Sequence, residues 1–149
     1  MKNLCKSVIA AGALAVVATG SFADEPAKER QELMKTVKKA VQVLVPMAKG
    51  EAPYDAKAAV DAMKAINGVP DPFVALFPKG SETGHDTEAS PKIWENPAGF
   101  KAKAEEMKTA SAEGIKQAGE GVDALKAVLF GQVLKTCKSC HDEYRVKKN

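Results

Sequence analysis

The sequence predicts an all-α protein folded as an antiparallel four-helix bundle. Aromatic residues make up only 5% of the 149-residue chain, whereas alanine, lysine and glutamate are abundant, a composition that favours helices over strands. Apolar residues recur at steps of three or four in four separate stretches beyond residue 24, which is the spacing of amphipathic helices. Short connections join the first two and the last two stretches, and a long one joins the middle pair, as in antiparallel bundles. No internal repeat and no second domain are expected.

The first predicted helix begins near Pro26, a residue suited to an opening turn, and ends near Gly50, a candidate C-terminal cap. Pro46 lies inside this helix and cannot donate a backbone hydrogen bond, which predicts a kink or a tightened last turn. The apolar stripe of the helix comprises Leu33, Met34, Val37, Val41, Leu44 and Ala48.

The second helix is expected to start at Pro53 and Asp55 and to end at Asn67-Gly68. Its buried positions are expected to be Ala59, Met63 and Ile66. A long connection of roughly residues 69–95 follows, and its prolines and glycines forbid regular structure through most of it. The apolar side chains that we expect to be pinned against the bundle here are Phe73, Val74, Leu76, Phe77, Ile93 and Trp94.

The third helix is predicted to begin at Asn96-Pro97, where a capping side chain precedes a proline of the first turn. Its inner stripe comprises Phe100, Ala104, Met107, Ser111 and Ile115, and Gly119 and Gly121 mark the turn that follows. The fourth helix carries an apolar stripe made of Val122, Leu125, Leu129, Val133, Cys137, Cys140 and Tyr144. Two cysteines therefore share the face that meets the other helices.

The run Cys137-Lys138-Ser139-Cys140-His141 is a C-x-x-C-H motif, the attachment signal of a c-type haem. Residues three apart lie on one face of a helix, so both thiols can reach the two vinyl groups of one porphyrin. The histidine that follows can offer a ring nitrogen to the iron. The motif therefore predicts one covalently attached haem c with its iron, held by Cys137 and Cys140, ligated by His141 and forming part of the core.

A C-x-x-C pair also occurs in dithiol redox sites and in zinc sites. A dithiol redox pair is typical of a strand followed by a helix, whereas the residues before Cys137 are predicted to be helical. A structural zinc site needs four ligands, and outside the motif the chain offers only His85 and Cys5. Haem attachment is therefore the favoured interpretation.

Residues 1–23 have the parts of a secretory signal peptide: Lys2 and Lys6, a short apolar run at 8–18 and a small-x-small cleavage site at 21–23. The apolar run is too short to span a bilayer comfortably, and Cys5 would leave with the signal, so no membrane or lipid anchor is expected. The predicted mature domain is residues 24–149. Export of a paired C-x-x-C-H motif to an oxidising compartment favours a periplasmic location.

The predicted mature chain is nearly neutral, with 20 basic against 19 acidic residues. Two haem propionates would bring its formal charge to about −1, and this balance gives no support to a nucleic-acid partner. The sequence also offers no nucleophile–base constellation, so no enzymatic turnover is expected.

Across essentially the whole predicted mature region, the chain resembles the cytochrome c′ family, the soluble class II c-type cytochromes. The segments that carry the resemblance are Arg30-Gln31-Glu32-Leu33-Met34, Lys49-Gly50-Glu51-Ala52-Pro53-Tyr54-Asp55, Ile93-Trp94 and Cys137-Lys138-Ser139-Cys140-His141-Asp142-Glu143-Tyr144-Arg145. The C-terminal place of the haem motif is the most specific of these, because the more common class I cytochromes carry it near the N-terminus.

By this resemblance the two cysteines form thioethers and His141 is the proximal iron ligand. Met34, four residues after Arg30, faces the distal side of the iron. Arg145 lies against the proximal imidazole, and Arg30 reaches a haem propionate.

Two branches of the family differ at the distal face. In one, an apolar side chain packs over a five-coordinate, high-spin iron that binds nitric oxide or other small gases. In the other, a methionine of the first helix ligates a low-spin iron and the protein shuttles electrons. Leu33-Met34-Lys35 resembles the second branch, so we expect a one-electron carrier with His141 and Met34 as axial ligands. A methionine can also merely fill space, which keeps the gas-binding alternative open; a haem-free helical interaction protein is a third reading.

The other candidates have ordinary explanations. Met47, Met63 and Met107 are spaced as core residues, and His85 lies in a polar loop where it is expected to be solvated. Lysines expected to ring the haem edge and to steer an acidic redox partner are Lys35, Lys38, Lys39, Lys135 and Lys138, with a simple solvated face as the alternative. Members of the family are often dimers through their first two helices, and the sequence leaves monomer or homodimer undecided.

Overall fold

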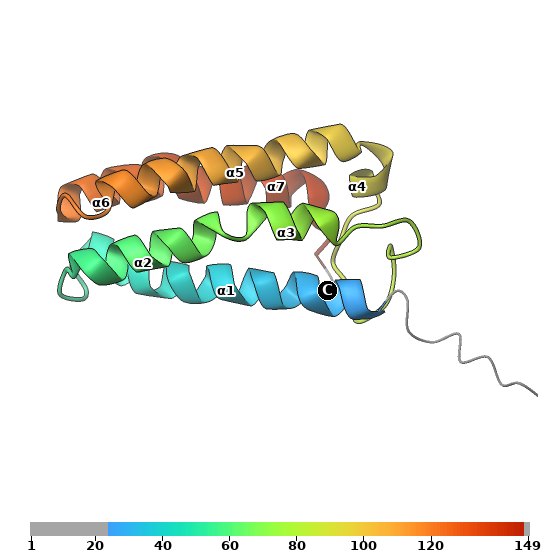
Figure 1. The fold of residues 1–149 in the computed structure, drawn as a ribbon, viewed down its shortest axis with the longest axis horizontal. Coiled ribbons are helices and arrows are strands. Elements are labelled where there is room, and N and C mark those ends of the chain that lie inside the picture. The colour runs from blue at the N-terminus through green and yellow to red at the C-terminus, as the bar shows by residue number, and fades with distance from the viewer. Residues whose placement is uncertain (1–23, 148–149) are drawn as a thin grey trace, which may run out of the picture.

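A computed structural model describes residues 24–147 as a four-helix bundle (Figure 1). Its arms are α1 (Asp24–Lys49), α2 (Ala56–Asn67), α5 (Pro97–Gln117) and a last arm that joins α6 (Val122–Val128), the π-helical η1 (Leu129–Val133) and α7 (Leu134–Tyr144). Short turns join α1 to α2 and α5 to α6, so each pair is antiparallel. The predicted all-α bundle is confirmed, and the predicted signal peptide lies outside the described residues.

The predicted helix ends have the expected chemistry. The N–H of Gly50 donates to the Met47 carbonyl (3.1 Å) and that of Glu51 to the Pro46 carbonyl (2.9 Å), so α1 ends in a tightened turn. Gly50 has a φ of +74°, the left-handed conformation that this kind of helix end needs. The Asp55 carboxylate accepts from the Ala58 N–H (2.9 Å) and caps α2.

The long connection is more ordered than its prolines and glycines predict. It contains two short helices, α3 (Pro70–Ala75) and α4 (Lys92–Glu95). Pro70 and Pro72 fall in the first turn of α3, where a helix needs no N–H donor from them. Position along the helix, rather than proline content, therefore decided the structure of this segment.

The last arm departs from the predicted regular helix. One π-helical turn interrupts it at η1, and this extra residue per turn shifts the faces on which later side chains lie. Leu125, Leu129 and Val133 are buried as predicted, whereas Val122 is 38% exposed at the first turn of α6. Cys137 and Cys140 are half-buried at the other end of the arm.

Two apolar clusters fill the bundle. The main core contains the fully buried Leu44, Met63 and Ile66 together with residues of the last arm. A second cluster joins the connection to the end of α7; its buried members are Ile93, Phe100 and Tyr144, and Phe73, Val74, Phe77, Ala89, Trp94 and Cys140 pack against them. The connection is therefore packed against the bundle next to a cysteine of the haem motif, as predicted for all its named apolar side chains except Leu76, which is in neither cluster.

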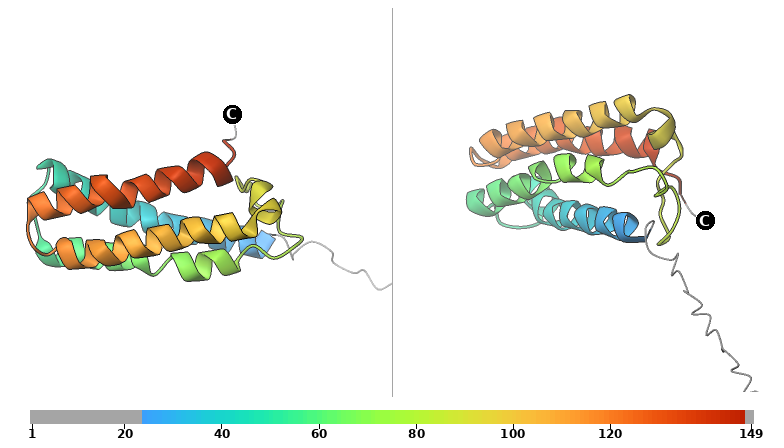
Figure 2. Two further views of the ribbon diagram at one scale, coloured as in Figure 1. Left: turned by 90° about the horizontal axis from the view of Figure 1, so that it is seen from above. Right: turned by 45° about the vertical axis from the view of Figure 1, so that its right-hand side comes forward.

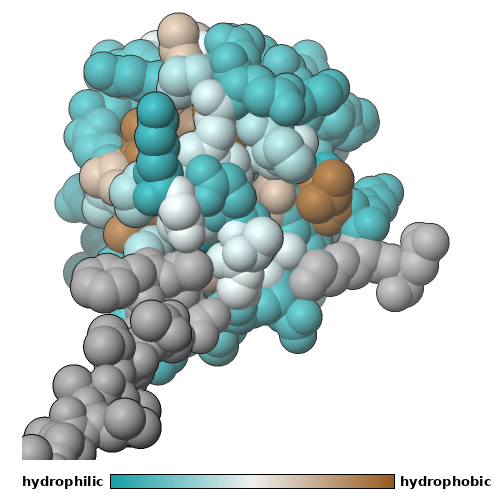
Figure 3. Space-filling model, turned by 90° about the vertical axis from the view of Figure 1, so that its right-hand side faces the viewer, coloured by the Kyte–Doolittle hydropathy of each residue, from teal (hydrophilic) through white to brown (hydrophobic). Residues whose placement is uncertain are grey.

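The end of the bundle at which α1 begins and α7 ends is mostly hydrophilic, with a few separate hydrophobic spots (Figure 3). None of the helices in residues 24–147 is both long enough and apolar enough to cross a membrane.

Candidate functional site

Cys137 and Cys140 lie on α7 as half-buried free thiols. Burial raises the pKa of Cys137, and it raises the pKa of Cys140 to about 11, with a further contribution from Cys137 beside it. Both thiols are therefore protonated at neutral pH in this structure. A dithiol redox pair works through a low-pKa thiolate, so this environment does not fit that interpretation.

His141 follows on the exposed side of α7. Partial burial lowers the pKa of His141, and the positive charge of Arg145 lowers it further, while Asp142 and Glu88 act in the opposite direction. Both effects favour the neutral imidazole, which is the form that ligates a metal.

Tyr144 fixes the end of α7 to the start of α5. Its side chain is only 3% exposed, and its ring packs edge-on against Phe100 with 5.3 Å between centroids. Asn96 caps α5 by accepting from the Gly99 N–H (3.0 Å), and its amide donates to the Tyr144 hydroxyl (3.4 Å). This contact anchors the turn of α7 that carries the haem motif.

Beyond α7 the chain becomes extended and pairs with the long connection. Ala89 and Arg145 form an antiparallel bridge, in which the Ser90 N–H donates to the Tyr144 carbonyl and the Val146 N–H to the Glu88 carbonyl, each at 2.9 Å. The Arg145 guanidinium forms an ion pair with the Glu88 carboxylate.

Arg30 lies on the inner face of α1, where it is 4% exposed. Its guanidinium donates to the carbonyls of Pro26 (3.1 Å) and Ser81 (2.8 Å), and its Cζ lies 4.4 Å from the centroid of the Phe77 ring. Burial lowers the pKa of Arg30, an effect that Glu82 partly offsets. The remaining nitrogen, Nη1, is buried and has no hydrogen-bond partner among the described residues.

Met34 is one helical turn further along α1 from Arg30. Its side chain is half-buried and packs against the main core together with Leu33. Arg30 and Met34 share the inward-facing side of α1, because residues four apart lie on one face of a helix.

The two arms that carry these residues separate at this end of the bundle. α1 packs against α2, α6 and η1, whereas α7 packs against α5 and α4. α1 and α7 consequently diverge toward the end at which the haem motif lies (Figure 2). The structure therefore places Met34 and the haem motif on different arms of the bundle, α1 and α7.

The residues present fit a c-type haem. Two half-buried thiols on one helix face supply the thioether positions, and a neutral imidazole follows them. The buried Nη1 of Arg30 has no acceptor among the described residues, and such an unpaired group lowers the free energy of unfolding. An anionic propionate could accept a hydrogen bond from this nitrogen. In residues 24–147, no group of three or more His, Cys, Asp and Glu side chains is arranged to hold a metal ion, so the zinc interpretation gains no support.

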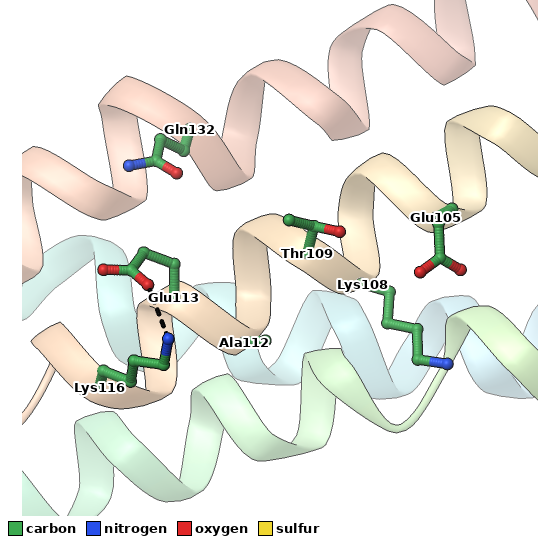
Figure 4. A pocket seen from close by; sticks show the side chains of 7 residues that line it. All are labelled: Glu105, Lys108, Thr109, Ala112, Glu113, Lys116 and Gln132. Carbon is green, nitrogen blue, oxygen red and sulfur yellow. Dashed lines mark hydrogen bonds and ion pairs between the residues drawn. The ribbon is translucent and has the colours of Figure 1, made fainter.

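The remaining sequence candidates lie elsewhere. Met47 and Met63 are buried in the main core and Met107 packs against it, while His85 is exposed at a left-handed turn of the connection. A surface depression along α5 reaches Gln132 of the last arm, and Glu113 and Lys116, which form an ion pair on α5, are among the residues that line it (Figure 4). None of its lining residues belongs to the haem motif.

Sequence reasoning missed the surroundings of the two arginines. Ser81 and Phe77 enclose Arg30, and Glu88 holds Arg145, although each partner is more than 40 residues away in the chain. Single serine, phenylalanine and glutamate residues in a loop carry no pattern that points to such contacts. Only the path of the connection over the end of the bundle brings them together.

Comparison with known proteins identifies the family of this chain. The profile of the family described as Cytochrome C′ matches residues 25–145. The cytochrome c′ of Rhodopseudomonas palustris is 40% identical over 124 residues, covering 81% of this chain and 82% of that protein. The solved structure of cytochrome c′ from Rhodopseudomonas palustris has a TM-score of 0.78 at 35% identity and covers 83% of this chain and 98% of its own.

A further solved structure is the nitric oxide complex of a leucine-to-isoleucine variant of cytochrome c prime from Alcaligenes xylosoxidans. It has a TM-score of 0.74 at 32% identity, and the match covers 85% of this chain and all of that one. The chain therefore belongs to the cytochrome c′ family, whose members carry one covalently attached haem c with its iron.

Proposed function

We propose that this monohaem cytochrome carries single electrons between redox partners and does not turn over a substrate. The haem supplies the redox chemistry when bound, because its iron gains and loses one electron. Cys137 and Cys140 would hold it by thioethers, and His141 would donate an imidazole nitrogen to the iron. Arg30 offers its unpartnered Nη1 to a propionate.

Met34 is proposed as the distal ligand. The observation that carries this assignment is the place of Met34 on the inner face of α1, one turn beyond the buried Arg30. If Arg30 binds a propionate, the next turn of the same helix, which carries Met34, would be near the haem. A neutral thioether there favours ferrous iron and raises the reduction potential, which suits an electron carrier.

Gas binding is the second candidate function. It is favoured by the solved relatives from Alcaligenes xylosoxidans, 31–32% identical to this chain, that hold nitric oxide. In this alternative Met34 fills space over the iron without ligating it, and the distal position stays open to a small ligand.

The ferric spin state separates the two functions. We expect a low-spin ferric spectrum for the unsubstituted protein and a high-spin one for Met34→Leu, a substitution that nearly conserves side-chain volume. Met47→Leu, at a buried methionine of the same helix, is the matched control and should remain low-spin. A high-spin spectrum that Met34→Leu leaves unchanged would defeat the ligand assignment and favour gas binding.

The docking surface is proposed to be the group of lysines near the haem that have no carboxylate partner. Lys35 pairs with Glu32 and Lys138 with Asp142, which leaves Lys38, Lys39 and Lys135 without an ion pair among the described residues. Unpaired exposed lysines contribute most to steering an acidic partner. This narrows the five lysines that the sequence suggested to three.

Charge reversal tests the docking surface. Replacing Lys38, Lys39 and Lys135 by glutamate should slow electron transfer with an acidic partner at least about tenfold at low salt and flatten its salt dependence. Lys126→Glu on α6, toward the opposite end of the bundle (Figure 1), should have little effect. Equal rates and equal salt dependence in all variants would refute the surface.

We also propose that residues 1–23 direct the chain to the periplasm and are removed there. N-terminal sequencing of the protein from a periplasmic fraction should begin at Asp24. A sedimentation experiment on the same material decides between monomer and homodimer.

A further inference from the structure

Glu88 lies in the long connection, far in sequence from the haem motif, yet it is joined to the residue that follows α7. Its backbone carbonyl accepts from the Val146 N–H at 2.9 Å. Its carboxylate oxygen Oε2 accepts from Nε of Arg145 and forms an ion pair with Nη2 of the same guanidinium. Backbone and side chain of Glu88 therefore both contact the segment just beyond α7.

Arg145 in turn lies close to the proposed proximal ligand. Its backbone N–H donates to the His141 carbonyl (3.3 Å), and its φ of −118° and ψ of 129° end the helix at this residue. Arg145 and Glu88 are both among the charges that act on the His141 imidazole, in opposite directions. The three side chains thus form one electrostatic group at the end of α7.

The Arg145 side chain needs an external restraint to keep its charge in one place. It is 48% exposed, and a long side chain at the surface loses rotamer entropy when it is held in one geometry. A single exposed ion pair adds little to stability. Here, however, the bridge between Ala89 and Arg145 already fixes the two backbones, so the pair mainly decides where the guanidinium lies.

We propose that Glu88 is a positioning residue, which holds the Arg145 guanidinium beside the proximal imidazole and thereby fixes a positive charge near the haem iron. A fixed positive charge disfavours the ferric state and favours reduction. A guanidinium released into solvent would have a weaker, screened effect. This inference rests on the proposed role of His141 as the proximal ligand. It adds a contact that raises the equilibrium constant for reduction of the iron.

The test is a double-mutant cycle on the haem-loaded protein, with the equilibrium constant for reduction as the readout. In the unsubstituted background, Arg145→Gln should lower this constant about three- to fivefold. In the Glu88→Gln background, the same Arg145→Gln change should lower it by less than about twofold, because the guanidinium is no longer held near the iron. The hyperfine-shifted proton resonances of the His141 ring should change in Glu88→Gln as well.

Asp71→Asn is the matched control, because Asp71 forms an exposed ion pair with Lys108 (2.8 Å) between α3 and α5. In that background Arg145→Gln should retain its full effect. If Arg145→Gln lowered the equilibrium constant for reduction by the same factor with and without Glu88, the proposal would be overturned. It would also be overturned if Arg145→Gln had no effect on this constant.

The double-mutant cycle gives a result whether or not Met34 ligates the iron. The spin state tests the assignment of Met34 separately, so an error in that assignment would not affect the cycle. If His141 is not a ligand, its ring resonances would lack hyperfine shifts in the unsubstituted protein, a result that refutes the proximal site and this inference together.

Discussion

Replacing Gly99 by alanine should disturb the contact between Tyr144, at the end of α7, and Asn96, at the start of α5. A β-carbon at position 99 would lie 2.5 Å from the Tyr144 hydroxyl oxygen and still closer to the Asn96 side-chain nitrogen. Real β-carbons do not approach atoms this closely, so Tyr144 or Asn96 must move. Moving either residue would weaken this contact, because Asn96 caps α5 and donates a hydrogen bond to the Tyr144 hydroxyl.

The magnitude follows from the contacts that the substitution disturbs. Weakening the Asn96 cap costs about 1 kcal/mol, and the loss of a long side-chain hydrogen bond costs roughly 0.5 kcal/mol. Crowding against the buried Tyr144 side chain costs about 1–3 kcal/mol. Alanine has a higher helix propensity than glycine, which returns up to about 1 kcal/mol. We therefore expect Gly99→Ala to lower the free energy of unfolding by about 2 kcal/mol.

Urea unfolding, followed by circular dichroism and by the emission of Trp94, the single tryptophan of the chain, measures this change. Gly131→Ala is the matched control, because a β-carbon at that helical glycine meets nothing within 4 Å; its free energy of unfolding should be unchanged or higher. The double variant Gly99→Ala/Tyr144→Phe removes the hydroxyl oxygen and should recover about half of the loss.

The reasoning fails if Gly99→Ala is as stable as Gly131→Ala. It also fails if the double variant is less stable than Gly99→Ala alone, since the clash with the Tyr144 hydroxyl would then not be the cause.

Two further predictions concern the core and the thiols. Leu44→Ala, at a fully buried side chain, should lower the free energy of unfolding by about 2–5 kcal/mol. Val43→Ala, at the neighbouring position that is 40% exposed, should change it by less than about 1 kcal/mol. Similar losses in the two variants would contradict the assigned buried face of α1. In the haem-free protein, burial raises the pKa of Cys140 from its ordinary value near 9.0 to about 11, so the folded state binds the thiol proton more tightly than the unfolded chain does and stability should fall as the pH rises from 9 to 11. Alkylation of Cys140 by iodoacetamide should accelerate over the same range, and a rate already at its plateau at about pH 9 would refute the buried environment.

Much of the fold could be predicted because local chemistry decides it. The caps Asp55 and Asn96 and the left-handed Gly50 fix the helix ends through groups within a few residues of each other. The haem motif is likewise local, since spacing along one helix sets the geometry of both thiols. Stripes of apolar residues then identified the buried faces of the helices. The predicted burial of Val122 was wrong because the first turn of α6 is open to solvent.

The helical class, the bundle and the place of the haem motif on the last arm could thus be read from the chain alone, because they follow from contacts within one or two turns. The π-helical turn, the enclosure of Arg30 by Ser81 and Phe77, and the pairing of Glu88 with Arg145 emerge only from the packed fold. These features depend on how a connection of more than twenty residues crosses the end of the bundle. No local pattern encodes that path, since the burial of its aromatic side chains against α5 and α7 fixes it.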